Sequence, residues 1–180
     1  MNKKIDISEM MIKTERLLLR PWRYTDLQDF NEYASVDGVG QMAGWLPHKN
    51  MDESKAILKM FIEEKKTFAI EHDGKVIGSL GIEEYDEDKL SEFKEKYGRE
   101  IGYVLSRDYW GKGLMPEAIK AVIKYLFDDV GLDFVICCHF TDNEQSKRVQ
   151  EKCGFKHYKL IRSETRYDIV KDSWASVLSR

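Results

Sequence analysis

The chain has 180 residues, which suits one domain with a substantial buried core. Its formal net charge of -3 excludes the strongly basic surface typical of nucleic-acid-binding proteins. No apolar run approaches the roughly 18 residues of a membrane span, and the leader MNKKIDISEMM is not a signal peptide. We therefore expect a cytoplasmic protein of one domain over residues 1–180, with a flexible leader over residues 1–11.

Cysteine and histidine give no sign of a metal site. The three cysteines, Cys137, Cys138 and Cys153, form no CxxC pair, and the histidines are scattered. The first two are neighbours in an apolar run, where we expect a structural role rather than a reactive thiol. We expect neither a structural zinc ion nor a disulfide framework.

In the first half of the chain, hydrophobic periodicity and turn residues separate five elements. Thr25 and Asp26 can cap a helix, and Asp73-Gly74 is a strong hairpin signal. A loop over Asp37–Asn50 carries several glycines. The expected elements are a strand at Thr14–Arg20, a helix after Asp26, a helix at Met51–Glu64, and strands at Thr67–Glu71 and Lys75–Glu83.

The second half alternates strands and helices after a charged loop at Tyr85–Arg99. The expected elements are a strand at Glu100–Leu105, a helix at Met115–Val130, a strand at Phe134–Phe140, a helix at Asn143–Lys152, and strands at Lys156–Thr165 and Ser173–Leu178. This order predicts an α/β fold with an antiparallel front half. The unit from Glu100 to Phe140 should be a right-handed parallel crossover.

The stretch SRDYWGKGLMPEA, at residues 106–118, joins a strand to a long helix through two glycines. Gly111 and Gly113 allow a close backbone approach to a ligand, and the helix N-terminus offers unpaired N–H groups. Such an end attracts anions, and Lys112 adds a positive charge. Leu114-Met115 lacks the hydroxyl of a P-loop, and Pro116 breaks the dinucleotide pattern GxGxxG. A phosphate ligand and a plain turn both remain open on this pattern alone.

Three ordered motifs together resemble the GNAT acetyltransferase superfamily, within it the Rim-type branch that includes ribosomal-protein N-terminal acetyltransferases. They are TERLLLRPW at Thr14–Trp22, YWGKG followed by Glu117-Ala118, and the N-x-x-S…K-x-G-F pattern from Asn143 to Phe155. The resemblance covers about residues 12–165. It implies a mixed, mostly antiparallel sheet of six to seven strands with about four helices.

The resemblance also implies acetyl-CoA as the cofactor and a set of residues that bind it. The loop from Tyr109 to Met115 would hold the pyrophosphate, and strand N–H groups would bind the pantetheine arm and the acetyl group. The residues so assigned are Tyr103, Val104, Leu105, Tyr109, Trp110, Gly111, Lys112, Gly113, Leu114, Met115, Asn143, Ser146 and Lys152.

Acetyl transfer to an amine needs a base, because an α-amino group has a pKa of about 8 and a lysine of about 10.4. Glu100 begins the strand on which this family often places its carboxylate base, although a solvated strand-end glutamate is the alternative. Many GNAT enzymes use a tyrosine on the later helix as the acid, but none lies between Asn143 and Lys152. Ser146 is the candidate acid because related Rim-type proteins carry serine there. Asn143 also suits a simple helix cap.

The acceptor is open on sequence alone. An amine acceptor could be a protein N-terminus or a small molecule such as an antibiotic, a polyamine or an amino acid, and a non-catalytic acyl-CoA sensor is the contrasting alternative. We expect the acceptor pocket to be walled by the loop Met42–Leu46, the helix Met51–Glu64, the last strands, and residues near Glu83-Glu84. The aromatic candidates for that wall are Trp22, Trp45, Tyr85 and Trp174. We expect a monomer or homodimer that binds no nucleic acid, membrane or metal.

Overall fold

A single twisted sheet of eight strands forms the centre of the molecule in the computed structural model, which describes residues 1–180. The strand order is β1-β2-β3-β4-β5-β6-β8-β7, and every pair is antiparallel except β5 and β6. The strands are β1 (Ile12–Lys13), β2 (Leu18–Pro21), β3 (Thr67–His72), β4 (Lys75–Glu83), β5 (Gly98–Leu105), β6 (Phe134–Phe140), β7 (Lys156–Glu164) and β8 (Val170–Ser179). The predicted mixed, mostly antiparallel α/β sheet is confirmed, with one strand more than expected.

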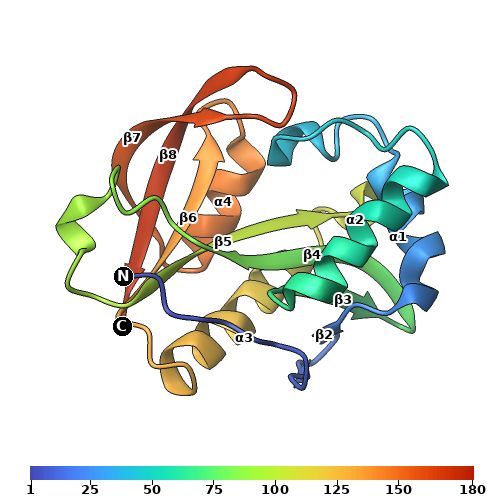
Figure 1. Cartoon of the computed structure of the whole chain (residues 1–180), viewed down its shortest axis with the longest axis horizontal. Coiled ribbons are helices and arrows are strands. Elements are labelled where there is room, and N and C mark those ends of the chain that lie inside the picture. Colours follow the sequence, from blue (N-terminus) through green and yellow to red (C-terminus); the bar gives the residue numbers. More distant parts are fainter.

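Four helices cover the two faces of this sheet (Figure 1). The helices α1 (Leu27–Ala34) and α2 (Met51–Glu64) pack on one face through a cluster around Trp22, Phe30 and Leu58. The helix α3 (Leu114–Asp128) packs on the opposite face through the main core cluster, which also receives Val149 of α4 (Glu144–Lys152). Because α3 connects the parallel strands β5 and β6, it forms the expected crossover.

Two elements near the N-terminus differ from the sequence expectation because polar side chains form other hydrogen bonds. The predicted strand at Thr14–Arg20 begins only at Leu18, because Thr14 forms a turn with Leu17 through N–H···O=C and side-chain hydrogen bonds. Asp26 precedes α1 but does not cap it with its side chain. Its carboxylate instead accepts hydrogen bonds from the guanidinium of buried Arg20 at 2.8 and 2.9 Å.

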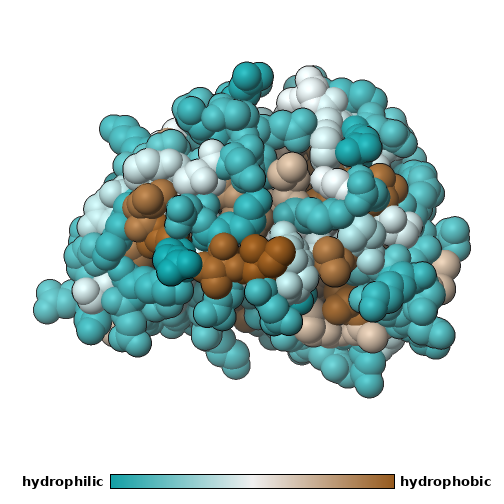
Figure 2. Space-filling view, turned by 90° about the horizontal axis from the view of Figure 1, so that it is seen from above, coloured by the Kyte–Doolittle hydropathy of each residue, from teal (hydrophilic) through white to brown (hydrophobic).

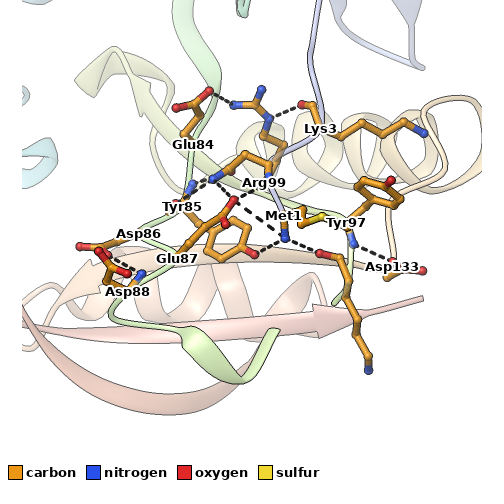
Figure 3. Close-up of polar contacts among 12 residues, drawn as sticks. Met1, Lys3, Glu84, Tyr85, Asp86, Glu87, Asp88, Tyr97, Arg99 and Asp133 are labelled. Carbon is orange, nitrogen blue, oxygen red and sulfur yellow. Dashed lines mark hydrogen bonds and ion pairs between the residues drawn. The ribbon is translucent and has the colours of Figure 1, made fainter. Parts of the chain in front are cut away.

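The N-terminal segment packs against the sheet, although the sequence suggested a flexible leader. Ile5 and Ile7 are buried in the main core cluster. Lys3 accepts a hydrogen bond through its carbonyl from Nε of Arg99, and the Met1 amino group contacts the Tyr85 hydroxyl at 2.6 Å (Figure 3). The segment thus reaches both β5 and the loop that precedes it.

The charged loop between β4 and β5 is anchored by apolar side chains. It contains only a short 3-10 turn at Ser91–Phe93, as expected for a loop. Tyr85 and Leu90 of this loop are buried against Phe134 and Ile136 of β6. The loop therefore covers β6 on one face of the sheet, on the side away from α3. No helix of the molecule combines the length and the apolar character that a bilayer crossing requires.

Candidate active site

The two parallel strands at the centre of the sheet separate part-way along their length. β5 and β6 pair from Gly98 and Phe134 as far as Ile101 and Cys137. Beyond this point each strand stays paired with its outer neighbour, β5 with β4 and β6 with β8. Residues 102–105 and 138–140 therefore diverge and leave a cleft, which opens into a cavity of about 560 Å³.

The cavity brings together almost all of the residues that the sequence motifs singled out. They come from the ends of β5 and β6, the N-terminus of α3 and one face of α4. The predicted residues that line it are Glu100, Tyr103, Val104, Leu105, Tyr109, Trp110, Gly111, Gly113, Leu114, Met115, Asn143, Ser146 and Lys152. Lys112 is the exception, because its ammonium lies over the ring of Tyr109, 5.0 Å from the centroid.

The glycine loop presents a run of free backbone donors to this cavity. The N–H groups of residues 111–115 donate no hydrogen bond within the chain, and they lead directly into α3. Gly111 and Gly113 both have φ of +76°, a left-handed conformation that other residues adopt only with strain. At Gly111 an added Cβ would meet no atom within 4 Å. This geometry fits an anionic group such as a pyrophosphate.

Trp110 fixes the loop to the end of β5. Its indole Nε1 donates a 2.8 Å hydrogen bond to the carbonyl of Leu105, and its ring lies beneath the guanidinium of Arg107. The aromatic residue of the YWGKG motif therefore holds the strand and the loop in a fixed relation.

A second anchor joins the glycine loop to the beginning of the domain. Glu117, in the first turn of α3, accepts hydrogen bonds from the Thr14 hydroxyl at 2.6 Å and from the backbone N–H of Arg16 at 2.9 Å. The Arg16 guanidinium binds the same carboxylate and also donates to the carbonyl of Lys112 at 3.0 Å. Burial acts to raise the pKa of Glu117, but these hydrogen bonds outweigh it, so the pKa lies below its usual value.

Glu100 occupies the floor of the cleft, where the strands begin to separate. It pairs with Glu83 of β4 and Ile136 of β6 in the sheet register. Burial raises the pKa of its carboxyl to about 7, while a hydrogen bond with the Cys138 thiol works in the opposite direction. Next to it, Gly102 is exposed and an added Cβ would meet no atom within 4 Å. A carboxylate with this pKa that lines the cavity can accept a proton near neutral pH.

On the other face of β5, Tyr103 meets Ser146 of α4. The two hydroxyl oxygens lie 2.7 Å apart. Asn143 caps α4 by accepting a hydrogen bond from the backbone N–H of Ser146 at 3.0 Å, and its amide also donates to the carbonyl of Met42 at 3.3 Å. The capping role considered from sequence is present, and the same side chain ties α4 to the loop between α1 and α2.

The opposite end of the cavity lies between the α1–α2 loop and the β7–β8 hairpin. The backbone N–H of Arg166 donates to the carbonyl of Gly44 at 2.8 Å, so these two segments touch. Figure 2 views the molecule from the side of these loops, where apolar surface lies between hydrophilic rims. Residues lining this end include Val39, Met42, Phe140, Glu164, Arg166 and Ser173.

The aromatic wall that we expected for this end is absent. None of the four candidates lines the cavity, and neither do the helix α2 or the pair Glu83-Glu84. Trp22 and Tyr85 are buried in core clusters, while Trp174 stacks on His157 at a centroid distance of 4.8 Å. Trp45 packs beside His48. Burying a large aromatic ring in the core is strongly favourable, and a sequence pattern does not show which rings are buried there.

Several residues that line the cavity were not singled out from the sequence. One of them is Arg148, which lies one turn from the predicted Lys152 on α4; both line the cavity, and neither forms an ion pair within the chain. Their i, i+4 spacing on one helix face is a signal that could have identified Arg148. Ser173 is 1% exposed, and its hydroxyl has no hydrogen-bond partner. Its position depends on the fold of the hairpin and has no local signature.

The family model for the "Acetyltransferase (GNAT) domain" matches residues 16–156 of the chain. The chain belongs to the GNAT acetyltransferase family. This acetyltransferase is 30% identical over 159 residues to the uncharacterized N-acetyltransferase YoaA of Bacillus subtilis (strain 168), covering 84% of this chain and 86% of that protein. The family transfers acetyl groups from acetyl-CoA, so the enzyme class and the cofactor expected from the motifs are confirmed.

Solved structures of acetyltransferases share the fold. The ribosomal-protein-S5-alanine acetyltransferase from Vibrio fischeri superposes with a TM-score of 0.72 at 18% identity, over 94% of this chain and 96% of that one. The microcin C7 self-immunity acetyltransferase MccE, solved in complex with acetyl-CoA and AMP, gives a TM-score of 0.77 at 16% identity, over 93% and 94% of the two chains. At these identities the likeness establishes the fold of this acetyltransferase.

Proposed function

We propose that this acetyltransferase acetylates a primary amine by direct attack on acetyl-CoA, with Glu100 as the base. One observation carries the proposal. A single cavity contains, at one place, the free N–H groups of residues 111–115 and, at another, the Glu100 carboxyl with a pKa of about 7. An anion-binding loop positions the donor, and a carboxylate that titrates near neutrality serves an amine nucleophile.

The donor end offers three kinds of contact for CoA. The loop from Tyr109 to Met115 holds the pyrophosphate through its backbone, and the edge of β5 at residues 103–105 has backbone groups facing the cleft for the pantetheine amides. Arg148 and Lys152 supply positive charge for phosphate groups, because neither has an internal partner. Acetyl-CoA supplies an acyl carbon that is already activated as a thioester.

Two side chains handle the protons of the transfer. Forming the C–N bond and breaking the C–S bond removes one proton from the neutral amine and delivers one proton to the departing sulfur. Glu100 accepts a proton from the acceptor amine, and the Ser146 hydroxyl donates toward the departing sulfur. Both line the same cavity, on opposite faces of β5. No covalent enzyme intermediate is required, and the pKa of buried Cys137 lies well above its usual value because of burial.

For the acceptor we propose the α-amino group of a protein N-terminus. The Rim-type motifs and the fold shared with a ribosomal-protein acetyltransferase favour this class. The contact between Gly44 and Arg166 bridges the acceptor end, which suits a slender chain end rather than a bulky ring system. Backbone groups along the separated edge of β6, at residues 138–140, can hydrogen-bond to an extended peptide.

The test is a panel of acceptors assayed by release of CoA thiol from acetyl-CoA. The panel contains peptides with different N-terminal residues, and polyamines, free amino acids and aminoglycosides as small amines. We expect turnover with peptides, and a loss of roughly 100- to 10,000-fold in kcat/KM for Glu100→Gln. The matched control is Glu63→Gln, which removes an exposed carboxylate on α2 and should leave the rate unchanged.

Two outcomes would contradict parts of this proposal. Turnover confined to small amines would move the acceptor to that class while leaving the chemistry intact. Tight binding of acetyl-CoA with no turnover on any amine would favour a non-catalytic acyl-CoA sensor instead.

A further inference from the structure

Four polar side chains form a continuous hydrogen-bonded chain beneath the donor end of the cavity. The Tyr103 hydroxyl lies 2.7 Å from Oγ of Ser146. Nε2 of Gln150 lies 3.4 Å from the same oxygen, one turn further along α4. Oε1 of Gln150 in turn lies 2.9 Å from Nδ1 of His139, on β6. Gln150 is 1% exposed and His139 is 5% exposed, so the bond between these two side chains is largely shielded from water.

The direction of each hydrogen bond, starting from His139, follows from whether its atoms can donate or only accept. Oε1 of Gln150 can only accept, so Nδ1 of His139 carries the hydrogen. Burial lowers the pKa of His139, which keeps the imidazole neutral with a single N–H to place. With Oε1 engaged by His139, the amide of Gln150 turns its N–H donor toward Ser146. The oxygen of Ser146 therefore accepts from this side.

Tyr103 can supply a second donor to the same oxygen, since its hydroxyl lies much closer to Oγ of Ser146, at 2.7 Å, than to the Ser146 carbonyl, at 3.3 Å. Burial raises the pKa of Tyr103 well above its usual value, so the side chain remains a phenol with a proton to donate. The Gln150 amide and the Cys137 thiol are also close to the Tyr103 hydroxyl. A serine oxygen has two lone pairs and one hydrogen. When both lone pairs accept, the hydrogen of Ser146 is left to point elsewhere, and Ser146 lines the cavity.

We propose that Tyr103, with Gln150 and His139 behind Ser146, acts as a positioning residue that makes the Ser146 hydroxyl a one-way donor toward the sulfur of CoA. The inference rests on the proposed function, in which Ser146 serves the leaving sulfur. It goes further because it assigns a role to the phenol of Tyr103, which the sequence motifs placed at the site only for its backbone. It also explains how the site works without a tyrosine on α4: the aromatic hydroxyl comes from β5.

The proposal predicts a property of CoA binding that does not depend on turnover. A hydroxyl that can only donate stabilises a thiolate more than a thiol, so it lowers the pKa of the bound CoA sulfhydryl. The affinity for CoA should then rise with pH relative to desulfo-CoA, which lacks the sulfur. Calorimetric titration of both ligands at about pH 7 and about pH 9 brackets the ordinary range of a thiol pKa.

We expect the CoA-to-desulfo-CoA affinity ratio of the wild type to increase by about sixfold between these pH values, as a fall of one unit from a thiol pKa of about 8.5 would give. In Ser146→Ala the ratio should stay flat, and in Tyr103→Phe most of the increase should be lost. In the double variant the ratio should match Ser146→Ala alone, because Tyr103 acts through Ser146. Binding of desulfo-CoA itself should be unchanged in all three variants.

Tyr125→Phe is the matched control, because Tyr125 packs against the same core cluster from α3 and its hydroxyl forms no hydrogen bond within the chain. It should behave as the wild type. If the CoA-to-desulfo-CoA affinity ratio of Tyr103→Phe increases with pH as much as that of the wild type, the inference is overturned and the proposed function stands. A wild type that binds neither ligand refutes the proposed function, and the inference falls with it.

Discussion

Arg16 and Glu117 are 101 positions apart in the sequence and are bonded directly, with Nε and Nη2 of Arg16 lying 2.8 and 2.7 Å from Oε2 of Glu117. The same guanidinium also reaches the carbonyl of Lys112 in the glycine loop. The motif TERLLLR and the motif GKGLMPEA are thus linked directly in the fold. The first contains the cation that holds the second in place.

The first prediction concerns this anchor. Arg16→Ala should weaken CoA binding by about three- to tenfold, since the loop loses a hydrogen bond at Lys112 and the pair with Glu117, and a partly exposed pair contributes about 1 kcal/mol or less. The kcat at saturating acetyl-CoA should change little. Lys124→Ala is the control, because it breaks a fully solvated pair with Asp128 on the same helix. Equal CoA affinity in both variants would show that the anchor does not support the loop.

The parts of the fold that were predicted well are those whose signals are local. The strands Lys75–Glu83 and Phe134–Phe140 and the helix Met51–Glu64 have the bounds that the hydrophobic pattern indicates. The start of β2 was wrong because Thr14 forms a turn with Leu17 and its hydroxyl bonds Glu117 rather than a neighbouring strand. The side-chain cap at Asp26 was wrong because Arg20, six residues away, takes the carboxylate.

The candidate site also contains some residues that local sequence signals reveal and others that they do not. The glycine loop and Glu100 belong to one continuous stretch with a motif, so they could be placed from the sequence. The bond between Tyr103 and Ser146 joins β5 to α4 across 43 positions, and no local pattern reports it. The end of the cavity proposed for the acceptor depends on how the β7–β8 hairpin folds over the cleft to bring Arg166 against Gly44. Such contacts between distant segments are set by the whole fold.

The second prediction tests the glycine loop. Gly111→Ala should weaken CoA binding by at least about tenfold, because φ of +76° is strained for alanine by roughly 1 kcal/mol and relaxation would rotate the N–H groups away. Gly131→Ala is a matched control, with φ of +73° at the end of α3, outside the cavity. Both variants should melt at a similar temperature, lower than that of the wild type. Calorimetry should show weaker CoA binding for Gly111→Ala alone. A parallel loss in both would mean that the effect is general destabilisation.

The third prediction uses the ionisation of Glu100. Since its pKa is about 7 and the carboxylate is the form that accepts a proton, kcat/KM should rise with pH through about 7 and level off above it. The kcat/KM of Glu100→Gln should lack this rise, or limb, of the pH profile. Two acceptors with amine pKa values of about 8 and about 10.4 separate the contribution of the acceptor, which moves with the amine, from that of the enzyme, which does not. An unchanged limb in Glu100→Gln would remove this residue from the role of base.

Glu100 should also leave a mark on stability. Because the folded pKa of this acid is raised above its unfolded value of 4.5, the stability it contributes is fully present below 4.5 and is lost as the pH rises through about 7. Glu100→Gln should therefore melt at a higher temperature than the wild type at about pH 8, while the two should be close at about pH 5. The other ionisable groups that influence this carboxyl are Cys138, Glu83, Asp86 and Lys89, and they are the same in both proteins.

The fourth prediction concerns Arg148 and Lys152 on α4, of which only Lys152 was identified from the sequence motifs. Arg148→Gln and Lys152→Gln should each weaken CoA binding by about three- to thirtyfold, because a charge-assisted hydrogen bond to phosphate contributes roughly 1 to 2 kcal/mol. The loss should shrink as salt is added, since partly exposed charges are screened. Lys147→Gln on the same helix is the control, because that lysine pairs with Glu144 and lies outside the cavity. If Lys147→Gln weakens CoA binding as much as the other two, the effect reflects the net charge of α4 rather than contact with the phosphates.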